Sequence, residues 1–102
     1  MAAVFTERAS SQLEAIVSYI ARSSPRNARS TLARIESAVS LLDANPKLGT
    51  QRPDLNECDP PLRTWFVPPV MLVYREGMHD GIEIIVVAHG HQLLETLLQE
   101  ET

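Results

Sequence analysis

Two histidines near the end of the chain are the first residues able to do chemistry. His89 and His91 are separated by one residue, so they share one side of an extended segment. Neutral imidazole binds metal ions, but a site needs a third ligand, and only His79 or Glu83 is near enough in sequence to supply it. We interpret His89 instead as a side chain hydrogen-bonded at the end of a sheet. The sequence predicts no metal ion and no cofactor.

The single cysteine, Cys58, is not predicted to be a nucleophile. Its neighbours Glu57 and Asp59 place negative charge beside the thiol, which disfavours the reactive thiolate. One cysteine cannot form an intramolecular disulfide, as is usual in a reducing compartment. No apolar run is long enough to span a membrane, and charged residues between positions 7 and 14 interrupt any candidate signal peptide. We therefore expect a cytoplasmic protein.

Three runs rich in β-branched and aromatic residues predict the strands that carry these side chains. They cover residues 62–67, 70–75 and 82–89, and turn-forming residues separate them. Two hairpins in series make a three-stranded antiparallel meander. The sheet half of the chain is therefore predicted to be one continuous antiparallel unit.

The last predicted strand is apolar on both sides. Because side chains alternate along a strand, one face is predicted to carry Ile82, Ile84, Val86 and Ala88. The opposite face is predicted to carry Ile85, Val87 and His89. Such a strand should be covered on both faces, one by the helical half of the chain and the other by the C-terminal tail or a partner.

Two amphipathic stripes predict helices in the first half of the chain. Apolar residues recur at intervals of three and four, at Ala9, Leu13, Ile16 and Ile20 and again at Ala28, Leu32, Ile35, Val39 and Leu42. Thr6 and Ser24 are predicted N-caps, and Pro25 suits the first position of the second helix. The predicted link between the two helices is very short, so they fold into an αα-hairpin. The apolar stripes of this hairpin must cover one face of the sheet.

The predicted fold class is α+β, in a single domain of residues 1–102. An N-terminal strand at residues 2–5 precedes the αα-hairpin, which packs on the meander. Residues 47–61 are rich in proline and other turn formers and are predicted to be a connecting loop. Residues 92–101 are predicted to form a short C-terminal tail helix, because four leucines gather on one side.

The net charge of −4 hides an asymmetry between the two halves. Residues 1–52 hold seven Lys and Arg against four Asp and Glu, and residues 53–102 hold two Arg against nine acids. An acidic chain is a poor general binder of nucleic acid, because phosphate neutralisation needs clustered cations. The only basic cluster, Arg22, Arg26, Arg29 and Arg34, is interpreted from sequence as a solvated helix face.

A series of short motifs runs along nearly the whole chain. They are Phe5-Thr6-Glu7-Arg8-Ala9, Asn45-Pro46 with Leu48-Gly49, Leu62-Arg63, Tyr74-Arg75, Ile82-Glu83-Ile84, and Val87 with His89-Gly90. In this order and at these intervals the chain resembles the ParE/RelE toxins of bacterial toxin–antitoxin systems. ParE-like members are the better match.

The resemblance implies both a function and partners. ParE-like members inhibit DNA gyrase, and RelE-like members cleave messenger RNA on the ribosome. Members of both groups are neutralised by a cognate antitoxin, whose C-terminal segment wraps the toxin. We expect a non-enzymatic gyrase-binding toxin that forms a hetero-oligomer with its antitoxin, without membrane association or direct sequence-specific nucleic-acid binding. An inactive member that only binds its antitoxin is a further alternative.

RNA cleavage is the enzymatic alternative. It needs a base for the 2′-hydroxyl, an acid for the leaving oxygen and cations on the phosphate. Arg63, His89 and His91 are the candidates for these roles. Val86 and Gln92 stand where the family often carries arginine, and the sheet half is acidic. A phosphate-cleaving site is therefore poorly equipped in this sequence.

Contacts with the target or antitoxin are predicted on the meander and the tail. The predicted residues are Arg63, Trp65, Arg75, Ile84, Val86, Leu94, Leu97 and Leu98. Two alternatives stay open at this stage. The arginines can instead pair with the acids of the second hairpin, and the tryptophan can belong to the core.

Overall fold

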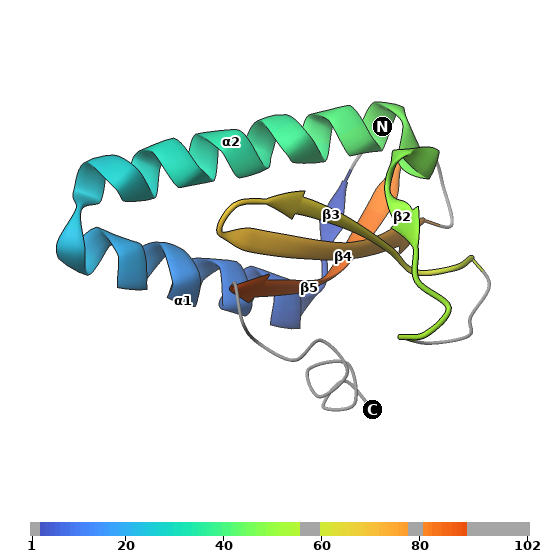
Figure 1. Cartoon of the computed structure of the whole chain (residues 1–102), viewed down its shortest axis with the longest axis horizontal. Coiled ribbons are helices and arrows are strands. Elements are labelled where there is room, and N and C mark those ends of the chain that lie inside the picture. The colour runs from blue at the N-terminus through green and yellow to red at the C-terminus, as the bar shows by residue number, and fades with distance from the viewer. Residues whose placement is uncertain (1–2, 56–59, 78–80, 90–102) are drawn as a thin grey trace.

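A computed structural model describes residues 3–55, 60–77 and 81–89 of the chain. In chain order the elements are β1 (Val4–Phe5), α1 (Glu7–Ser23), α2 (Pro25–Ala44), the 3₁₀ turn η1 (Pro46–Leu48), β2 (Thr50–Gln51), β3 (Arg63–Val67), β4 (Val70–Glu76) and β5 (Ile82–His89) (Figure 1). The α+β fold predicted from the sequence is confirmed. The predicted tail helix lies outside the described residues.

The helical hairpin begins and turns where the sequence predicts. The Thr6 hydroxyl accepts a hydrogen bond from the backbone N–H of Ala9 at 3.1 Å, which caps α1. Ser24 alone links the helices, and its hydroxyl accepts from the N–H of Asn27 at 3.1 Å to cap α2. Pro25 occupies the first turn of α2, where its missing N–H costs nothing. A one-residue link leaves the helices antiparallel along one side of the sheet (Figure 1).

The sheet is mixed and has five strands in the order β1-β5-β4-β3-β2. Strands β3, β4 and β5 form the predicted antiparallel meander. The N-terminal strand β1 pairs in parallel with β5, and the helical hairpin and three further strands intervene between them in the chain. Strand β2 lies within the predicted connecting loop, and two residues are too few to show a strand pattern in sequence.

A bulge in β5 overturns the predicted strict alternation. Val73 of β4 pairs with Val86, but the next residue, Tyr74, pairs with Ile84, so Ile85 is the extra residue. An added residue reverses the facing of all side chains beyond it. The prediction that Ile84 and Val86 share a face is therefore wrong: Ile84 faces the helices and Val86 faces the other side of the sheet.

The two faces of the sheet carry two separate apolar clusters. The helix-facing core joins α1 and α2 to the sheet and includes Ile16, Ile35, Leu42, Leu72, Tyr74, Ile82, Ile84 and Val87. The outer cluster contains Leu62, Val73, Ile85, Val86 and Ala88, with Leu55 and Met71 packed against it. Both sides of β5 are thus buried, as its two apolar faces predict.

No helix in the described ranges is long and apolar enough to cross a membrane.

Candidate functional site

Arg63 and Tyr74 hold the turn that follows α2. The Tyr74 hydroxyl donates to the carbonyl of Pro46 at 2.8 Å and accepts from the N–H of Gly49 at 2.8 Å. Arg63 Nη1 donates to the carbonyls of Gly49 at 2.9 Å and Lys47 at 3.2 Å. We call this arrangement the 46–49 clasp. Motif residues that carried the family resemblance meet here, so the structure gives them a role in anchoring the turn.

The clasp explains why residue 49 is glycine. The φ of Gly49 is −68°, which any residue can adopt, so the backbone conformation does not require glycine. Glycine is required because a side chain would have no room. A Cβ at Gly49 would lie 2.7 Å from Cε1 and 2.8 Å from Cζ of the buried Tyr74 ring. We expect Gly49→Ala to lower the free energy of unfolding by about 1–3 kcal/mol, because the ring must move within a packed core. Denaturant melts check this, with Lys47→Ala as an exposed control; equal melts would contradict it.

Tyr74 also makes stability sensitive to alkaline pH. Burial is the largest influence on the Tyr74 phenol and raises its pKa, against the lowering effect of the Gly49 N–H. The folded state therefore holds the phenol proton more tightly than the unfolded state does. This stabilisation is complete below about pH 10, the ordinary tyrosine pKa, and is lost as pH rises through the higher folded pKa.

The stability advantage of the wild type over Tyr74→Phe is expected to shrink above about pH 10. Urea melts from pH 8 to 11 measure it. Tyr19→Phe is the control, because it removes a phenol whose side chain is 65% exposed. A constant difference between wild type and Tyr74→Phe across this range would contradict the assignment.

The residues proposed for RNA cleavage are not brought together. Across the sheet, Arg63 is level with Ile84, whereas His89 is level with Val67. Two strand spacings and four residues of strand separate the Cα atoms of Arg63 and His89 by roughly 16 Å. His91 lies outside the described residues. Arg63 is also engaged in the clasp, so the described part of the chain holds no convergent set of these groups.

His89 contacts an aromatic side chain of α1. Its ring lies 6.3 Å from the ring of Tyr19 on α1, centroid to centroid, in an edge-on arrangement of 73°. No group of three His, Cys, Asp or Glu side chains that could hold a metal ion occurs within residues 3–55, 60–77 and 81–89.

Arg75 and Trp65 make the intramolecular contacts that the sequence left open as alternatives. Arg75 Nε donates to Glu83 Oε1 at 3.0 Å, so this arginine pairs with an acid of the second hairpin. Trp65 is partly buried and packs against the helix-facing core. The next residue, Phe66, points to the outer face and is 54% exposed. Sequence reasoning missed Phe66, although alternation along β3 pairs one buried aromatic with one exposed aromatic.

The remaining predicted contact residues are not exposed or not described. Ile84 and Val86 are both fully buried, on opposite faces of the sheet. Ile84, Val86 and Ala88 therefore do not form one exposed patch, because the bulge places Ile84 on the opposite face and all three are buried. Leu94, Leu97 and Leu98 lie outside the described residues.

The edge of β5 beyond β1 is held by a side chain from α1. β1 pairs with residues 83–84 only, and Thr6 extends this pairing through its N–H to the Ile84 carbonyl at 3.0 Å. Farther along, Gln12 Oε1 accepts from the N–H of Val87 at 2.9 Å. This glutamine satisfies a backbone donor that would otherwise need a neighbouring strand. The only sequence signal for this contact was the position of Gln12 beside the apolar stripe of α1.

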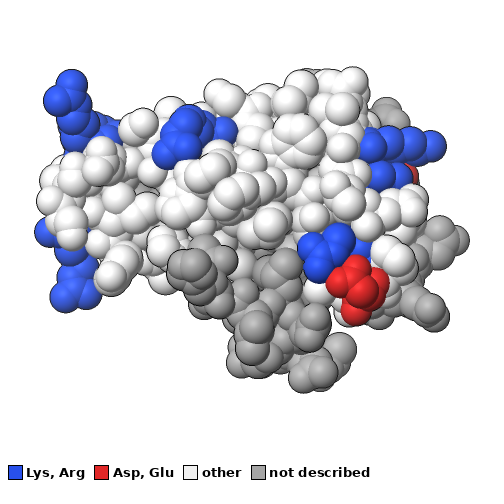
Figure 2. All heavy atoms as spheres, viewed as in Figure 1, with Lys and Arg blue, Asp and Glu red and all other residues white. Residues whose placement is uncertain are grey.

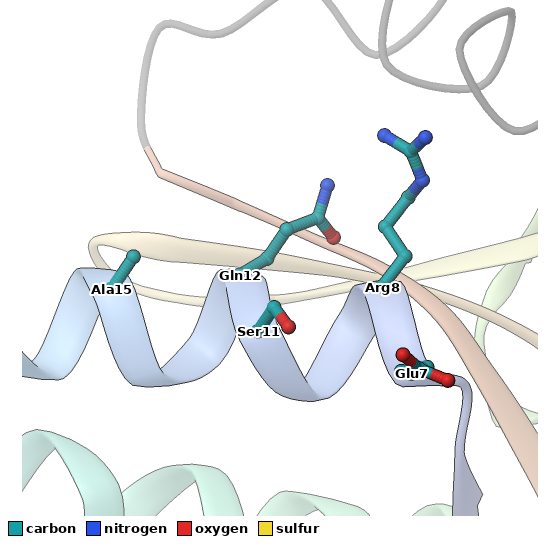
Figure 3. Close-up of a pocket in the computed structure, with 5 residues that line it drawn as sticks. All are labelled: Glu7, Arg8, Ser11, Gln12 and Ala15. Atoms are coloured by element: carbon teal, nitrogen blue, oxygen red, sulfur yellow. The ribbon is translucent and has the colours of Figure 1, made fainter.

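A shallow hollow of about 510 Å³ includes Gln12, the residue that reaches this edge. Five residues of α1 line it: Glu7, Arg8, Ser11, Gln12 and Ala15. Figure 3 shows the Arg8 and Gln12 side chains rising from α1 on the side where β5 passes. We call this hollow the α1–β5 groove.

A second groove, of about 360 Å³, follows the helical hairpin. Its lining is mostly apolar and includes Phe5, Leu13, Val17 and Leu32. These side chains are only partly buried, so the groove offers apolar area to a partner. We call it the interhelical groove.

Within its described residues the protein is a small α+β domain that presents grooves and a strand edge. The family model of the ParE toxin of the type II toxin–antitoxin system parDE matches residues 3–94. The toxin ParE3 of Caulobacter vibrioides is 37% identical over 75 residues, covering 74% of this chain and 71% of that protein. A solved structure titled "Chromosomal ParDE TA system from P. aeruginosa" matches with a TM-score of 0.65 and 25% identity, covering 87% of this chain and 95% of the other. The chain belongs to the ParE toxin family of type II toxin–antitoxin systems.

Proposed function

We propose that this ParE-family protein inhibits DNA gyrase by binding it and that a cognate antitoxin neutralises it. The family match over residues 3–94 is the observation that carries the proposal. Inhibition by binding needs no catalytic set, which agrees with the wide separation of Arg63 and His89. Such a target would place its action in the cytoplasm.

The antitoxin is proposed to use the two grooves. An extended segment in the α1–β5 groove would add a strand to the sheet, replacing the Gln12 side chain at the Val87 N–H with a backbone carbonyl. An amphipathic helix would bury its apolar face in the interhelical groove. These two recognition modes suit a single C-terminal segment that wraps around α1.

The target is proposed to contact the outer face and the tail. Phe66 is exposed on β3, and Arg75 and Glu83 form a half-exposed pair on the neighbouring strands. The leucines of the tail, Leu94, Leu97 and Leu98, are proposed to belong to the same contact. Aromatic and arginine side chains commonly dominate the energetics of protein interfaces.

A supercoiling assay tests the proposal directly. Purified protein, freed from its antitoxin, should block supercoiling of relaxed plasmid by gyrase, and added antitoxin should restore it. Relaxation by topoisomerase I should be unaffected and serves as the control. Unchanged supercoiling at excess protein would contradict gyrase as the target. Cut messages on translating ribosomes would then indicate RNA cleavage, and binding to the antitoxin with no growth defect would indicate an inactive member.

A further inference from the structure

The tip of the helical hairpin carries cations and no carboxylate. No Asp or Glu occurs from residue 15 to residue 35, whereas four arginines do. Three of them, Arg22, Arg26 and Arg29, are exposed beside the link between α1 and α2. We call these three the hairpin-tip cluster. In Figure 2 this end of the molecule shows Lys and Arg spheres and no acidic sphere on the visible face.

The cluster is not neutralised within the described part of the chain. At the other end of the domain, Arg52 pairs with Asp54 at 2.8 Å and Arg75 pairs with Glu83 at 3.0 Å. Arg22, Arg26 and Arg29 make no such contact with any described residue. Within the described ranges, no carboxylate competes with an external anion for these three charges.

Helix stabilisation does not account for the cluster. Arg22 lies in the last turn of α1, where a cation is favourable. The first turn of α2 contains no acid and holds Arg26, where the positive end of the helix dipole disfavours a cation. Arg26 therefore adds positive charge to the tip at a position where the dipole of α2 gives it no stabilisation.

Hydrogen-bond donors lie next to the cluster. A hollow of about 380 Å³ between α2 and the β3–β4 turn is lined by Asn27, Ser30, Thr31 and Arg34, with Ile20 and Pro69. Arg34 itself is engaged, since Nη1 donates to the Pro68 carbonyl at 2.7 Å and Nη2 to Thr31 at 3.3 Å. Hydroxyl and amide groups beside arginines are the usual ligands of backbone phosphates.

The scarcity of exposed apolar side chains beside the cluster favours nucleic acid over an acidic protein as its partner. Among the residues that the structure describes, the exposed large apolar side chains are Val4, Tyr19, Leu41, Leu48 and Phe66. Only Tyr19 lies near the cluster, one turn before Arg22, and its ring already lies edge-on to that of His89. Protein interfaces gain most of their affinity from such anchors, whereas interfaces with DNA are polar and positive. The three arginines are not interleaved with aromatic residues that could stack on unpaired bases, since Tyr19 is the one nearby aromatic and contacts His89, which favours a duplex.

We propose that the hairpin-tip cluster binds the phosphate backbone of duplex DNA without reading its sequence. Phosphate contacts position a protein on DNA and carry no base information. The surface lies on α1 and α2 at their shared link, away from the outer sheet face proposed for the target (Figure 1). The proposal does not depend on gyrase being that target.

Fluorescence anisotropy with a labelled 20-base-pair duplex tests the proposal on the full-length protein freed from its antitoxin. Three phosphate contacts predict a slope of about −2.7 for log K against log salt, so binding should weaken roughly 40-fold between 50 and 200 mM salt. The double variant R26Q/R29Q should retain the wild-type circular dichroism spectrum and lower the magnitude of the slope by about 1.8.

A charge-matched control separates local binding from net charge. K47Q/R52Q also removes two positive charges, at the other end of α2 and after β2, and should bind the duplex like the wild type. Failure of the wild type to bind, or equal loss in both double variants, would overturn the proposal. So would tighter binding of single-stranded DNA, or competition by poly-glutamate as effective as that by the duplex.

Discussion

Deletion of residues 92–102 is expected to abolish toxicity while leaving a folded domain that binds the antitoxin. Within the described residues, the helix-facing core joins α1 and α2 to the sheet, from Ala9 to Val87. The proposed function assigns contact with the target to the leucines of the tail. We expect near-complete loss of growth inhibition with a modest loss of stability. Colony counts after induction without antitoxin measure the first, and thermal melts measure the second.

Two further variants show which tail residues act. Serine at Leu94, Leu97 and Leu98 together should reproduce the loss of toxicity, whereas E95Q/E100Q should remain toxic. A truncated protein that stays fully toxic would refute the proposed role of the tail. A fall in melting temperature well beyond 4–8 °C would mean that deletion costs more than about 1 kcal/mol and that the tail supports the core.

Truncation of the helix-facing core should have the largest effect on stability. Ile35 is 1% exposed on α2, and Val87 is 1% exposed on β5; both belong to the cluster that joins helices to sheet. We expect Ile35→Ala to lower the free energy of unfolding by about 2–4 kcal/mol and Val87→Ala by about 1–3 kcal/mol, because each leaves a cavity. Denaturant melts measure both values.

Neighbouring exposed positions provide the control for these substitutions. Ser37 and Ser40 lie on the solvent side of α2, and alanine at either should change stability by less than about 0.5 kcal/mol. If Ile35→Ala and Val87→Ala also stay within about 0.5 kcal/mol, the two residues do not lie where helices meet sheet.

The elements of this fold follow from local patterns. Both helices begin and end within one residue of the limits predicted from sequence. The prediction used the apolar period of three and four residues, two capping residues and one proline. Runs of β-branched residues separated by turns place β3, β4 and β5 in the same way. These signals reside in neighbouring residues, so no knowledge of tertiary contacts is needed to use them.

The facing of side chains along β5 could not be predicted in this way. The bulge at Ile85 depends on how β5 pairs with β4, and it moves Val86 and Ala88 to the face opposite Ile84. Consequently the apolar patch predicted for a partner is divided, and the exposed aromatic of the sheet is Phe66. A period of two detects a strand but does not detect an inserted residue.

The sequence by itself determined the α+β class, the helical hairpin, the meander and membership of the ParE-like group, because each depends on residue types and intervals along the chain. Only the tertiary structure decided how the candidate surfaces are built. Gln12 reaches the N–H of Val87 across 75 residues, and Tyr74 reaches the carbonyl of Pro46 across 28. Such contacts have no local pattern, because any polar side chain on the correct helix face can make them once packing brings the backbone near.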